Sequence, residues 1–568
     1  MKNIFLVLGI LFLNACGAFK GRVELWEETY KKAETLEERG ATNFLYYDFK
    51  SLNGHAMETS VLPWKLVVAS LLWDQRESSD WDSSSRSKII SLRDKKLRAK
   101  MESFGLMYPD RILNVPQSLQ KPKQGPMGIF RGTLKNKFIG AEMEGSGIGC
   151  IACHGARAYD KDGFPTNDMY IGLGSTSFNP EMYVSEVWKG LSEVPDHSLD
   201  MYNYILKIFP DISKKERDTF RRALRTKSRH RFFGMDEIYS QIKKIKKTMD
   251  TAVPFSNGGQ GITNGVANLK FQFGLIERDQ FHSEETGFTS IPVIFDRGFR
   301  SSLLYDGVYY PKKTEQFLPI AKKDITEKHV YNLASLVSYF SIPTAGNSPE
   351  YAHKAIPKAF EALMFLESAE RPKFPGNVNL SLAEKGSKIY ENQCSRCHGI
   401  YDNTDLENPR LSWFPNKAVD VKEIGTDPQR EKGITQELLD TAMKSKMKVD
   451  LRLKKSGKYV APILTLLWTS APYLHNGSVP SVWALMNPKE RPKRFMIGGH
   501  RMDFDRMGIH FSDRNEEMAA YAVDYVPSST PGVYNTEELG KSNHGHEFPF
   551  LEMTQDQKLA LLEYLKLI

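Results

Sequence analysis

The feature that most constrains this 568-residue chain is a short motif, Cys-x-x-Cys-His, which occurs twice. The two copies are Cys150-Ile-Ala-Cys153-His154 and Cys394-Ser-Arg-Cys397-His398. In such a string both thiols can add across the vinyl groups of a porphyrin, and the adjacent histidine is placed to ligate the iron, so the string is the attachment site of a c-type haem. The sequence therefore predicts two covalently attached haem c groups, with His154 and His398 as iron ligands.

Two other uses of paired cysteines fit the pattern less well. A four-thiolate zinc site usually takes its two pairs from positions about 15–20 residues apart, whereas these pairs begin 394 − 150 = 244 residues apart. A redox-active dithiol, in which Cys-x-x-Cys lowers a thiol pKa, needs no histidine after the second cysteine. Both copies have that histidine, so haem attachment is the favoured interpretation.

The first sixteen residues are typical of an export signal. Lys2 precedes an apolar run from Ile4 to Leu13, which is shorter than the roughly 20 residues that cross a bilayer. We interpret residues 1–15 as a lipoprotein signal peptide, because Leu13-Asn-Ala-Cys16 is similar to a bacterial lipobox and would make Cys16 the lipidated residue. An ordinary signal peptide with an unmodified Cys16 is the alternative.

This N-terminus leads us to expect an exported protein that is lipid-anchored to a bacterial membrane and faces the periplasm or the cell surface. Gly17 follows the cysteine at a position where aspartate would favour retention in the inner membrane. A glycine there favours sorting to the outer membrane. No other stretch is long and apolar enough to span a bilayer, so membrane contact is expected through the lipid alone. Export agrees with haem attachment, because c-type haems are attached outside the bacterial cytoplasm.

Length and charge restrict the remaining possibilities. A chain of 568 residues suits two or three domains, and 40% hydrophobic residues provide a full core. Much of the formal charge of +8 lies between Lys214 and Lys247. This basic run could dock an acidic electron-donor protein or anionic lipid, but we favour an ordinary solvated helix face. No nucleic-acid motif is present, so no nucleic-acid partner is expected.

The chain divides into four expected parts. Residues 1–15 are the signal peptide, residues 16–125 an N-terminal extension, residues 126–374 a first haem domain, and residues 375–568 a C-terminal cytochrome c domain. Helices are expected at 24–40, 214–230, 235–250 and 325–342, and a linker is expected around Pro357 and Pro372–Gly376. The glycines of Gly145–Gly149 would let the backbone pass close to a porphyrin.

The C-terminal part has the clearest local signals. Ser381-Leu-Ala-Glu384 and Thr554-Gln-Asp-Gln557 are capping boxes that predict two helices. Gly386 on the first helix would permit a close crossing with an aromatic residue of the second. A helix, a haem motif and a terminal helix follow the plan of a cytochrome c domain. The expected fold class is therefore mainly α, with two cytochrome c-type haem domains, long loops and an N-terminal extension.

The function depends on what lies opposite each proximal histidine, because a second ligand gives an electron carrier and an open position admits peroxide or oxygen. His546, in the loop before the terminal helix, is the best candidate for the second iron, ahead of His544, Met496 and Met502. A surface histidine is the alternative for His546. For the first haem nothing singles out Met169 or Met182, so we hypothesise an open iron.

The segment Ala471-Pro-Tyr-Leu-His475-Asn-Gly-Ser478-Val-Pro480 resembles a signature of the bacterial di-haem cytochrome c peroxidase superfamily. Glu490-Arg-Pro492, Phe495 and Asn543–Glu547 make the branch of di-haem rubber oxygenases and related fatty-acid dioxygenases the most similar one. The resemblance implies two packed haem domains, with a reactive haem held by His154 and a six-coordinate electron-transfer haem bound by His398 and His546.

Two departures from the family pattern stand out. Ile291-Pro-Val-Ile-Phe295 resembles a family segment that often ends in the tryptophan that bridges the two haems. Here phenylalanine stands at that position, so the residue that would bridge the haems is not identified. His475-Asn476 stands where the peroxidases tend to have His-Asp. For His475 we favour a side chain that stabilises a turn near the second haem over one that acts directly in catalysis.

Together these features predict a di-haem c-type cytochrome oxidoreductase, with peroxide or dioxygen chemistry at the haem of His154 and electron transfer through the second haem. Peroxide reduction would need a small electron-donor protein, whereas dioxygenation would need an apolar unsaturated substrate. No catalytic side chain is predicted beyond the reactive haem itself. The alternative is a non-enzymatic periplasmic electron-transfer lipoprotein with two six-coordinate haems.

Overall fold

A computed structural model describes residues 20–47, 61–83, 85–136, 140–225, 257–273, 275–276, 287–341, 349–444 and 451–568. The expected signal peptide, Cys16 and the expected helix at 235–250 lie outside these residues. Within the described ranges, no helix has both the length and the apolar character needed to cross a membrane.

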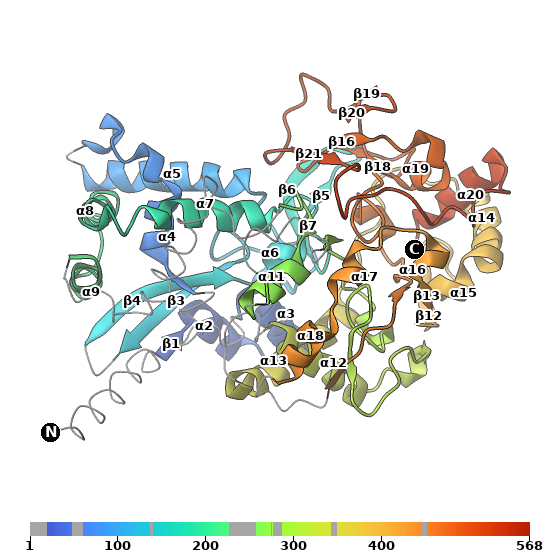
Figure 1. Ribbon diagram of the computed structural model, residues 1–568, viewed down its shortest axis with the longest axis horizontal. Coiled ribbons are helices and arrows are strands. Elements are labelled where there is room, and N and C mark those ends of the chain that lie inside the picture. Colours follow the sequence, from blue (N-terminus) through green and yellow to red (C-terminus); the bar gives the residue numbers. More distant parts are fainter. Residues whose placement is uncertain are drawn as a thin grey trace.

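The protein has a mixed α/β fold (Figure 1), with 41% helix and 17% strand. The expectation of a mainly α fold is therefore wrong, because many small sheets form between segments of the described chain. The structure does not show the two expected cytochrome c-type haem domains. The longest strands, β3 (Ile129–Asn136) and β4 (Ala141–Ile148), form one antiparallel pair. Most other strands have two to five residues, which is too short for alternation to stand out in a sequence.

The four-stranded sheet around this pair joins distant parts of the chain. Its order is β1-β3-β4-β2, with β1 at Lys20–Arg22 and β2 at Leu62–Pro63. The sheet thus combines residues from both sides of position 125, and the domain boundary proposed there stays a prediction. Gly145 and Gly147, two of the glycines expected beside a porphyrin, lie in β4, whereas Gly149 caps α6. A Cβ on Gly147 would lie 2.5 Å from the Phe130 ring. That glycine therefore makes room for an aromatic ring of the neighbouring strand.

Helices cover one face of this sheet, on the left of Figure 1. They are α4 (Trp64–Leu71), α5 (Arg86–Ser103), α7 (Pro180–Ser192), α8 (Ser198–Ile208) and α9 (Lys214–Arg225). With the sheet they enclose one hydrophobic cluster, which includes the buried Trp81. In α9, Lys214 and Lys215 are exposed whereas Thr219 and Phe220 are buried. The described part of the basic run is thus the outer face of an amphipathic helix.

The expected helix at 24–40 is two helices, α2 (Glu24–Lys32) and α3 (Leu36–Tyr46). Thr35 and Glu38 form a capping box that starts the second helix, a signal that the sequence analysis overlooked. Helix α3 packs on α13 (Pro349–Ser368), where a Cβ on Gly40 would meet the Glu361 carbonyl oxygen at 2.3 Å. Pro357, expected in a linker, lies inside α13.

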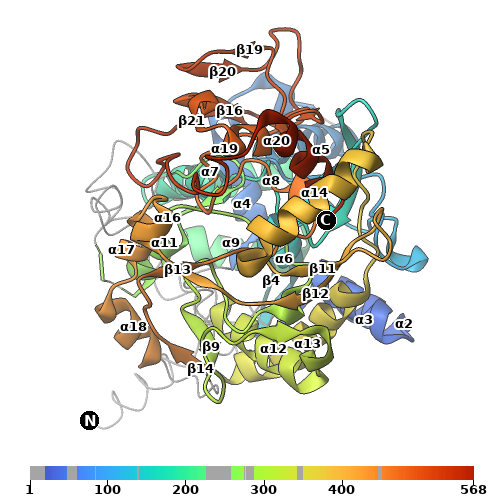
Figure 2. The ribbon, with the colours of Figure 1, turned by 90° about the vertical axis from the view of Figure 1, so that its right-hand side faces the viewer.

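The C-terminal helices cross as predicted. Helix α14 (Leu380–Gln393) begins at an Asn379 cap and not at Ser381, whereas α20 (Gln555–Leu565) begins with the expected Thr554–Gln557 capping box. The two helices lie side by side in Figure 2. A Cβ on Gly386 would lie 1.9 Å from the Ala560 carbonyl oxygen, and the rings of Tyr390 and Tyr564 are 5.3 Å apart. The missing side chain of Gly386 therefore sets the distance between the helices.

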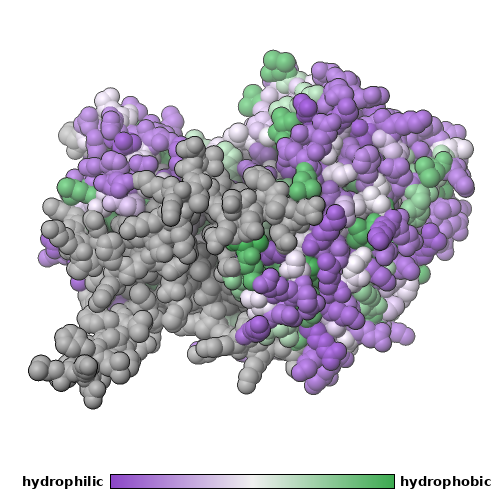
Figure 3. Space-filling view, viewed as in Figure 1, coloured by the Kyte–Doolittle hydropathy of each residue, from purple (hydrophilic) through white to green (hydrophobic). Residues whose placement is uncertain are grey.

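The remaining elements are short, apart from α12, which confirms the helix expected at 325–342. They are α6 (Cys150–Cys153), β5 (Gly155–Tyr159), β6 (Pro165–Ile171), β7 (Ile262–Thr263), α11 (Gly265–Gln272), β8 (Thr289–Ser290), β9 (Tyr309–Pro311), β10 (Ile320–Ala321), α12 (Glu327–Ser341), α15 (Ser395–His398), β11 (Ile400–Asp402), β12 (Arg410–Phe414), β13 (Ala418–Asp420), α16 (Val421–Ile424), α17 (Gln429–Gly433), α18 (Gln436–Met443), β14 (Leu451–Leu453), β15 (Lys458–Val460), α19 (Val482–Met486), β16 (Arg494–Ile497), β17 (Met502–Asp503), β18 (Gly508–Ile509), β19 (Asp513–Arg514), β20 (Met518–Ala520) and β21 (Gly532–Asn535). The coloured part of the face in Figure 3 is mainly hydrophilic, with small apolar patches.

Replacing Gly386 with valine is expected to destabilise the protein by about 1–3 kcal/mol or more. The added side chain would meet a backbone carbonyl, which cannot turn aside as a side chain could. Urea unfolding of both proteins measures the effect. Gly265→Val is the matched control in α11, because a Cβ at Gly265 meets nothing within 4 Å. Equal losses in the two variants would show that the close crossing is unimportant.

Candidate haem-binding sites

The first Cys-x-x-Cys-His motif forms a single helical turn directly after strand β4. Cys150–Cys153 make helix α6, and the backbone N–H of His154 donates to the Cys150 carbonyl at 2.9 Å. The imidazole Nδ1 of His154 lies 3.2 Å from the Pro292 carbonyl oxygen. Burial, and secondly the charge of Arg297, lower the pKa of His154 to about 4. A neutral ring that donates from Nδ1 keeps its Nε2 lone pair for a metal.

The second motif is built in the same way on α15, for which Cys394 is the N-terminal cap. The backbone N–H of His398 donates to the Cys394 carbonyl at 3.0 Å, and its Nδ1 lies 2.8 Å from the Pro462 carbonyl oxygen. His398 is 9% exposed, and burial lowers its pKa. Each predicted proximal histidine is therefore oriented by one proline carbonyl, which sequence reasoning missed.

The four motif cysteines form no disulfide with one another, and the two pairs lie in separate places. Cys153 and Cys150 pack against two neighbouring hydrophobic clusters, and Cys394 packs against the C-terminal core. Within the described residues, no group of three or more His, Cys, Asp or Glu side chains could hold a metal ion, so the pairs do not form a four-thiolate site. Burial raises the pKa of Cys150 and Cys153 to about 12, opposite to the lowering that a redox-active dithiol needs.

The two prolines begin equivalent turns that recur 462 − 292 = 170 positions apart. Four residues after each proline the backbone is left-handed, at Asp296 and at Leu466, with φ of 57° and 58°. Each of these residues precedes a 3₁₀ turn, at 297–299 and at 467–469. Non-glycine residues with positive φ are uncommon, so their recurrence at one offset marks a repeated structure.

The agreement continues through the following residues. Leu304 and Leu474 are both left-handed, with φ of 70° and 66°, and each follows an isolated bridge residue, Leu303 pairing with Tyr309 and Tyr473 with Val479. Gly307 and Gly477 also share a positive φ. We refer to residues 292–309 and 462–479 as the two proline turns. They share three identical residues in their first sixteen positions, too few to stand out in the sequence.

His546 faces His398, as expected of a sixth ligand. The two imidazole rings have centroids 5.9 Å apart and planes inclined by 60°. Two imidazoles bonded to one metal ion through bonds of about 2 Å have ring centres about 6 Å apart, so these residues fit an iron between them. Burial, and secondly His398, lower the pKa of His546 to about 3, and a neutral ring is the form that ligates.

The loop that carries His546 is fixed by its backbone. The His546 N–H donates to the Ile424 carbonyl at 2.8 Å, and Arg491 donates to the carbonyls of Asn543 and Gly545. His544, two residues earlier, is exposed. The other candidate ligands, Met496 and Met502, lie in strands β16 and β17. His546 is thus the candidate that the fold brings to His398.

In the part of the chain that the structure describes, the first motif has no such partner. Within the described ranges, no second histidine ring contacts that of His154 in the way that His546 contacts His398. Met169 is buried in strand β6, where it packs in the core beside Gly155, and Met182 is half-buried in α7. The two motifs therefore differ in what the fold places opposite the proximal histidine.

The proline turns meet at a buried polar contact. The Thr465 hydroxyl donates to Asp296 Oδ2 at 2.6 Å, and Asp296 also forms an ion pair with Arg371. Asp296 is 3% exposed, and its neighbour Phe295 shares a hydrophobic cluster with Leu466 of the other turn. Phe295, which stands where the resembling segment often has tryptophan, is therefore buried where the turns pack together.

His475 is buried at the same junction. Its ring lies 4.5 Å from that of Tyr459 and 6.2 Å from that of Tyr305, its counterpart in the other proline turn. The Ser290 N–H donates to the His475 carbonyl at 2.7 Å, whereas Nε2 finds no hydrogen-bond partner within the described part of the chain. Burial, and secondly Arg430, lower the pKa of His475 to about 3. These contacts agree with a role in the turn.

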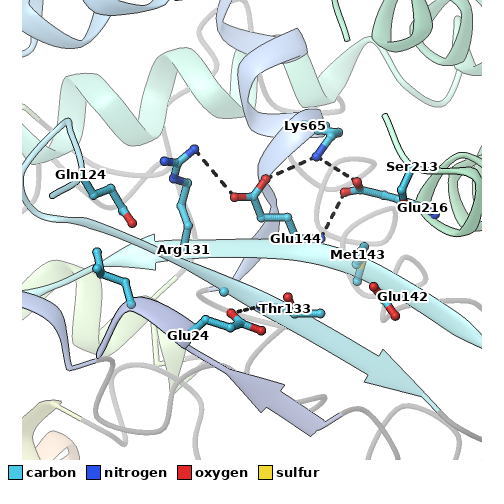
Figure 4. A pocket seen from close by; sticks show the side chains of 12 residues that line it. Glu24, Lys65, Gln124, Arg131, Thr133, Glu142, Met143, Glu144, Ser213 and Glu216 are labelled. Atoms are coloured by element: carbon cyan, nitrogen blue, oxygen red, sulfur yellow. Dashed lines mark hydrogen bonds and ion pairs between the residues drawn. The ribbon is translucent and has the colours of Figure 1, made fainter. Parts of the chain in front are cut away.

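A polar pocket of about 350 Å³ lies apart from the haem motifs, between β3, β4, α4 and α9. Figure 4 shows Lys65 between two carboxylates, with Nζ 2.8 Å from Glu216 and 3.3 Å from Glu144. Arg131 lies 3.7 Å from Glu144 on its other side. These lining charges pair with one another, so the pocket has a structural explanation.

Comparison with known proteins supports a cytochrome. Residues 457–496, which contain the second proline turn, match a family of RoxA-like, cytochrome c-like domains. Two uncharacterized proteins of Sinorhizobium fredii are similar: y4iJ is 27% identical over 258 residues, and y4iM is 23% identical over 215 residues. The matches cover 34% and 35% of this chain, and 41% and 48% of those proteins. Residues 457–496 are thus similar to a RoxA-like, cytochrome c-like domain, a kind of domain that implies covalently bound haem c and haem-based redox chemistry.

Proposed function

We propose that the protein is a di-haem c-type cytochrome oxidoreductase, related to the di-haem oxygenases and peroxidases, whose two haems have different roles. The observation that supports this most strongly is an asymmetry. Both Cys-x-x-Cys-His histidines donate to the carbonyl of an equivalent proline turn, but in the described part of the chain a second imidazole lies opposite His398 and not opposite His154. Haem c supplies one-electron redox chemistry, and it binds peroxide or dioxygen where a coordination position is open.

Each side chain then has a definite task. His154 and His398 hold the irons, while the carbonyls of Pro292 and Pro462 keep their rings neutral and oriented. His546 would supply a second protein ligand to the iron held by His398, which suits electron transfer because both oxidation states would keep the same ligands. An open position beside His154 suits peroxide or dioxygen as reactant. Peroxide reduction would take electrons from a small donor protein, and dioxygenation would act on an apolar unsaturated substrate.

The same proposal includes the cellular location. Residues 1–15 would act as a signal peptide, and Cys16 would carry the lipid that holds the protein to the membrane of a bacterium, with the outer membrane favoured. The sequence at 13–16 supports this, since it is similar to a lipobox. Mass spectrometry of the N-terminal peptide from exported protein should find a diacylglyceryl cysteine, and an unmodified Cys16 would remove the anchor.

The decisive experiment is a low-temperature electron paramagnetic resonance spectrum of the purified, fully oxidised protein, together with its haem-to-protein ratio. We expect two haems per chain, with one high-spin and one low-spin ferric signal of equal weight. Two low-spin signals would contradict the open iron and favour an electron carrier. A ratio of one haem per chain would contradict the di-haem proposal itself.

A further inference from the structure

Two arginines of the first proline turn, the half-buried Arg297 and the buried Arg300, have no counter-ion in direct contact among the described residues. Arg300 is 3% exposed, and its guanidinium donates to the carbonyls of Ser302 and Leu304 at 3.1 and 3.0 Å. Arg297 donates to the Val293 carbonyl. Within the described ranges, neither guanidinium forms an ion pair with a carboxylate, although buried charges are ordinarily paired.

The nearby carboxylates have other partners. Asp306 is held by Arg430 at 2.8 Å, and Asp296 is held by Arg371 and Thr465. Glu367 accepts the Gly298 N–H at 2.7 Å. Burial, and secondly the neighbouring Arg297, lower the pKa of Arg300 to about 9. Glu367 acts on Arg297, and Asp306 acts on Arg300, only from beyond ion-pair distance. Among the described residues, the two neighbouring positive charges therefore have no carboxylate in direct contact.

The turn itself does not require these arginines. The second proline turn has the same left-handed residues, 3₁₀ turn and bridge, but it carries Leu467 and Ser470 at the equivalent positions. The arginines also belong to the turn that holds His154, and the charge of Arg297 acts on that imidazole. The two arginines are thus specific to the first proline turn. This suggests that they interact with the haem that the first motif would bind.

We propose that Arg297 and Arg300 bind the two propionate carboxylates of the haem attached at Cys150 and Cys153. The inference rests on the proposed function, because it needs that haem. Two guanidinium groups match two carboxylates in number and charge, and the planar fork of arginine suits a carboxylate in a buried site. The second haem, whose turn offers Leu467 and Ser470, would have its carboxylates held by other residues.

This placement has an electrochemical consequence. Positive charge near an iron favours the reduced state, which carries one positive charge less than the oxidised state. The guanidinium groups of Arg297 and Arg300 should therefore raise the reduction potential of the His154 haem and leave that of the His398 haem unchanged. A purely structural role, as donors to backbone carbonyls, would change the stability of the protein without separating the two potentials.

The test is a spectroelectrochemical titration of the holoprotein with Arg297→Leu and Arg300→Ser, which install the residues of the second turn. In each variant the equilibrium constant for reduction of the first haem should fall at least tenfold, a shift of about 59 mV for one electron, while the second haem keeps its midpoint. Arg297→Lys and Arg300→Lys keep the charge and should stay within a threefold change, and they serve if a neutral variant does not fold.

The outcomes separate the two proposals. Unchanged midpoints in the neutral variants, or equal shifts at both haems, would overturn the propionate assignment while the di-haem function stands. A charge-conserving variant that shifts the first haem as much as a neutral one would overturn it as well. If wild-type protein carries no haem at Cys150 and Cys153, the proposed function itself fails first.

Discussion

Replacing His546 with asparagine is expected to convert the second haem from low-spin to high-spin or water-ligated, with no loss of covalently attached haem. The His546 and His398 rings face each other with centroids 5.9 Å apart, so removal of one leaves the iron with a single imidazole. Asparagine is chosen because residue 546 has a φ of 53°, which asparagine tolerates better than alanine. Electron paramagnetic resonance of oxidised protein should show the low-spin signal lost completely.

The matched control is His544→Asn, because His544 lies two residues away in the same loop and is exposed. It should leave both signals unchanged. The variants should have the same haem-to-protein ratio, since neither touches Cys394 or Cys397. Retention of the low-spin signal in the His546 variant would remove this residue as the ligand and direct attention to Met496 or Met502.

Local signals in the sequence predicted the parts of the structure that depend on few neighbouring residues. The Thr554–Gln557 capping box starts α20 as expected. Helices α14 and α20 cross at Gly386 because a residue without a Cβ lets the two backbones approach closely. The position of His546 in a loop before the last helix was enough to suggest that it would reach His398. In the first two cases the relevant residues share one short segment or two adjacent helices, whereas His546 reaches His398 from a loop far along the chain.

The fold class was wrong because the strands give little periodic signal. Strands such as β2, β7 and β10 have two residues each, and they pair with partners far along the chain. Even in β3 and β4, glycines stand where a longer side chain would have shown the alternation. These strands form because they pair with other segments in the folded protein. An interpretation based on neighbouring residues alone therefore identifies helices and assigns the short strands to loops.

The repeated proline turns were missed for a different reason. What recurs in them is backbone: a carbonyl that faces a histidine, left-handed residues four and twelve positions later, and an isolated bridge. Such backbone features allow different side chains at equivalent positions, aspartate or leucine at one and tyrosine or histidine at another, so the sequences of the two turns differ. The haem motifs recur at an offset of 244 and the turns at one of 170, so a search at a single period would not join them.

Replacing Arg371 with leucine is expected to cost about 3–5 kcal/mol of folding free energy, because it leaves a buried carboxylate without its charge partner. The side chain of Asp296 is 4% exposed, and its other contact is the Thr465 hydroxyl. Urea unfolding of the oxidised holoprotein measures the loss. A change below 1 kcal/mol would mean that solvent or another cation reaches Asp296.

A double-mutant cycle separates the ion pair from the packing of Arg371. Asp296→Asn keeps an acceptor for Thr465 and tolerates the φ of 57° at this position, but it leaves Arg371 buried without a carboxylate. The double variant Asp296→Asn/Arg371→Leu should therefore be more stable than the sum of the single losses predicts, by about 0.5–3 kcal/mol. Additive losses would mean that the two side chains act independently. Because Asp296 and Thr465 join the two proline turns, a measured coupling would make this ion pair part of what holds His154 and His398 at a fixed separation.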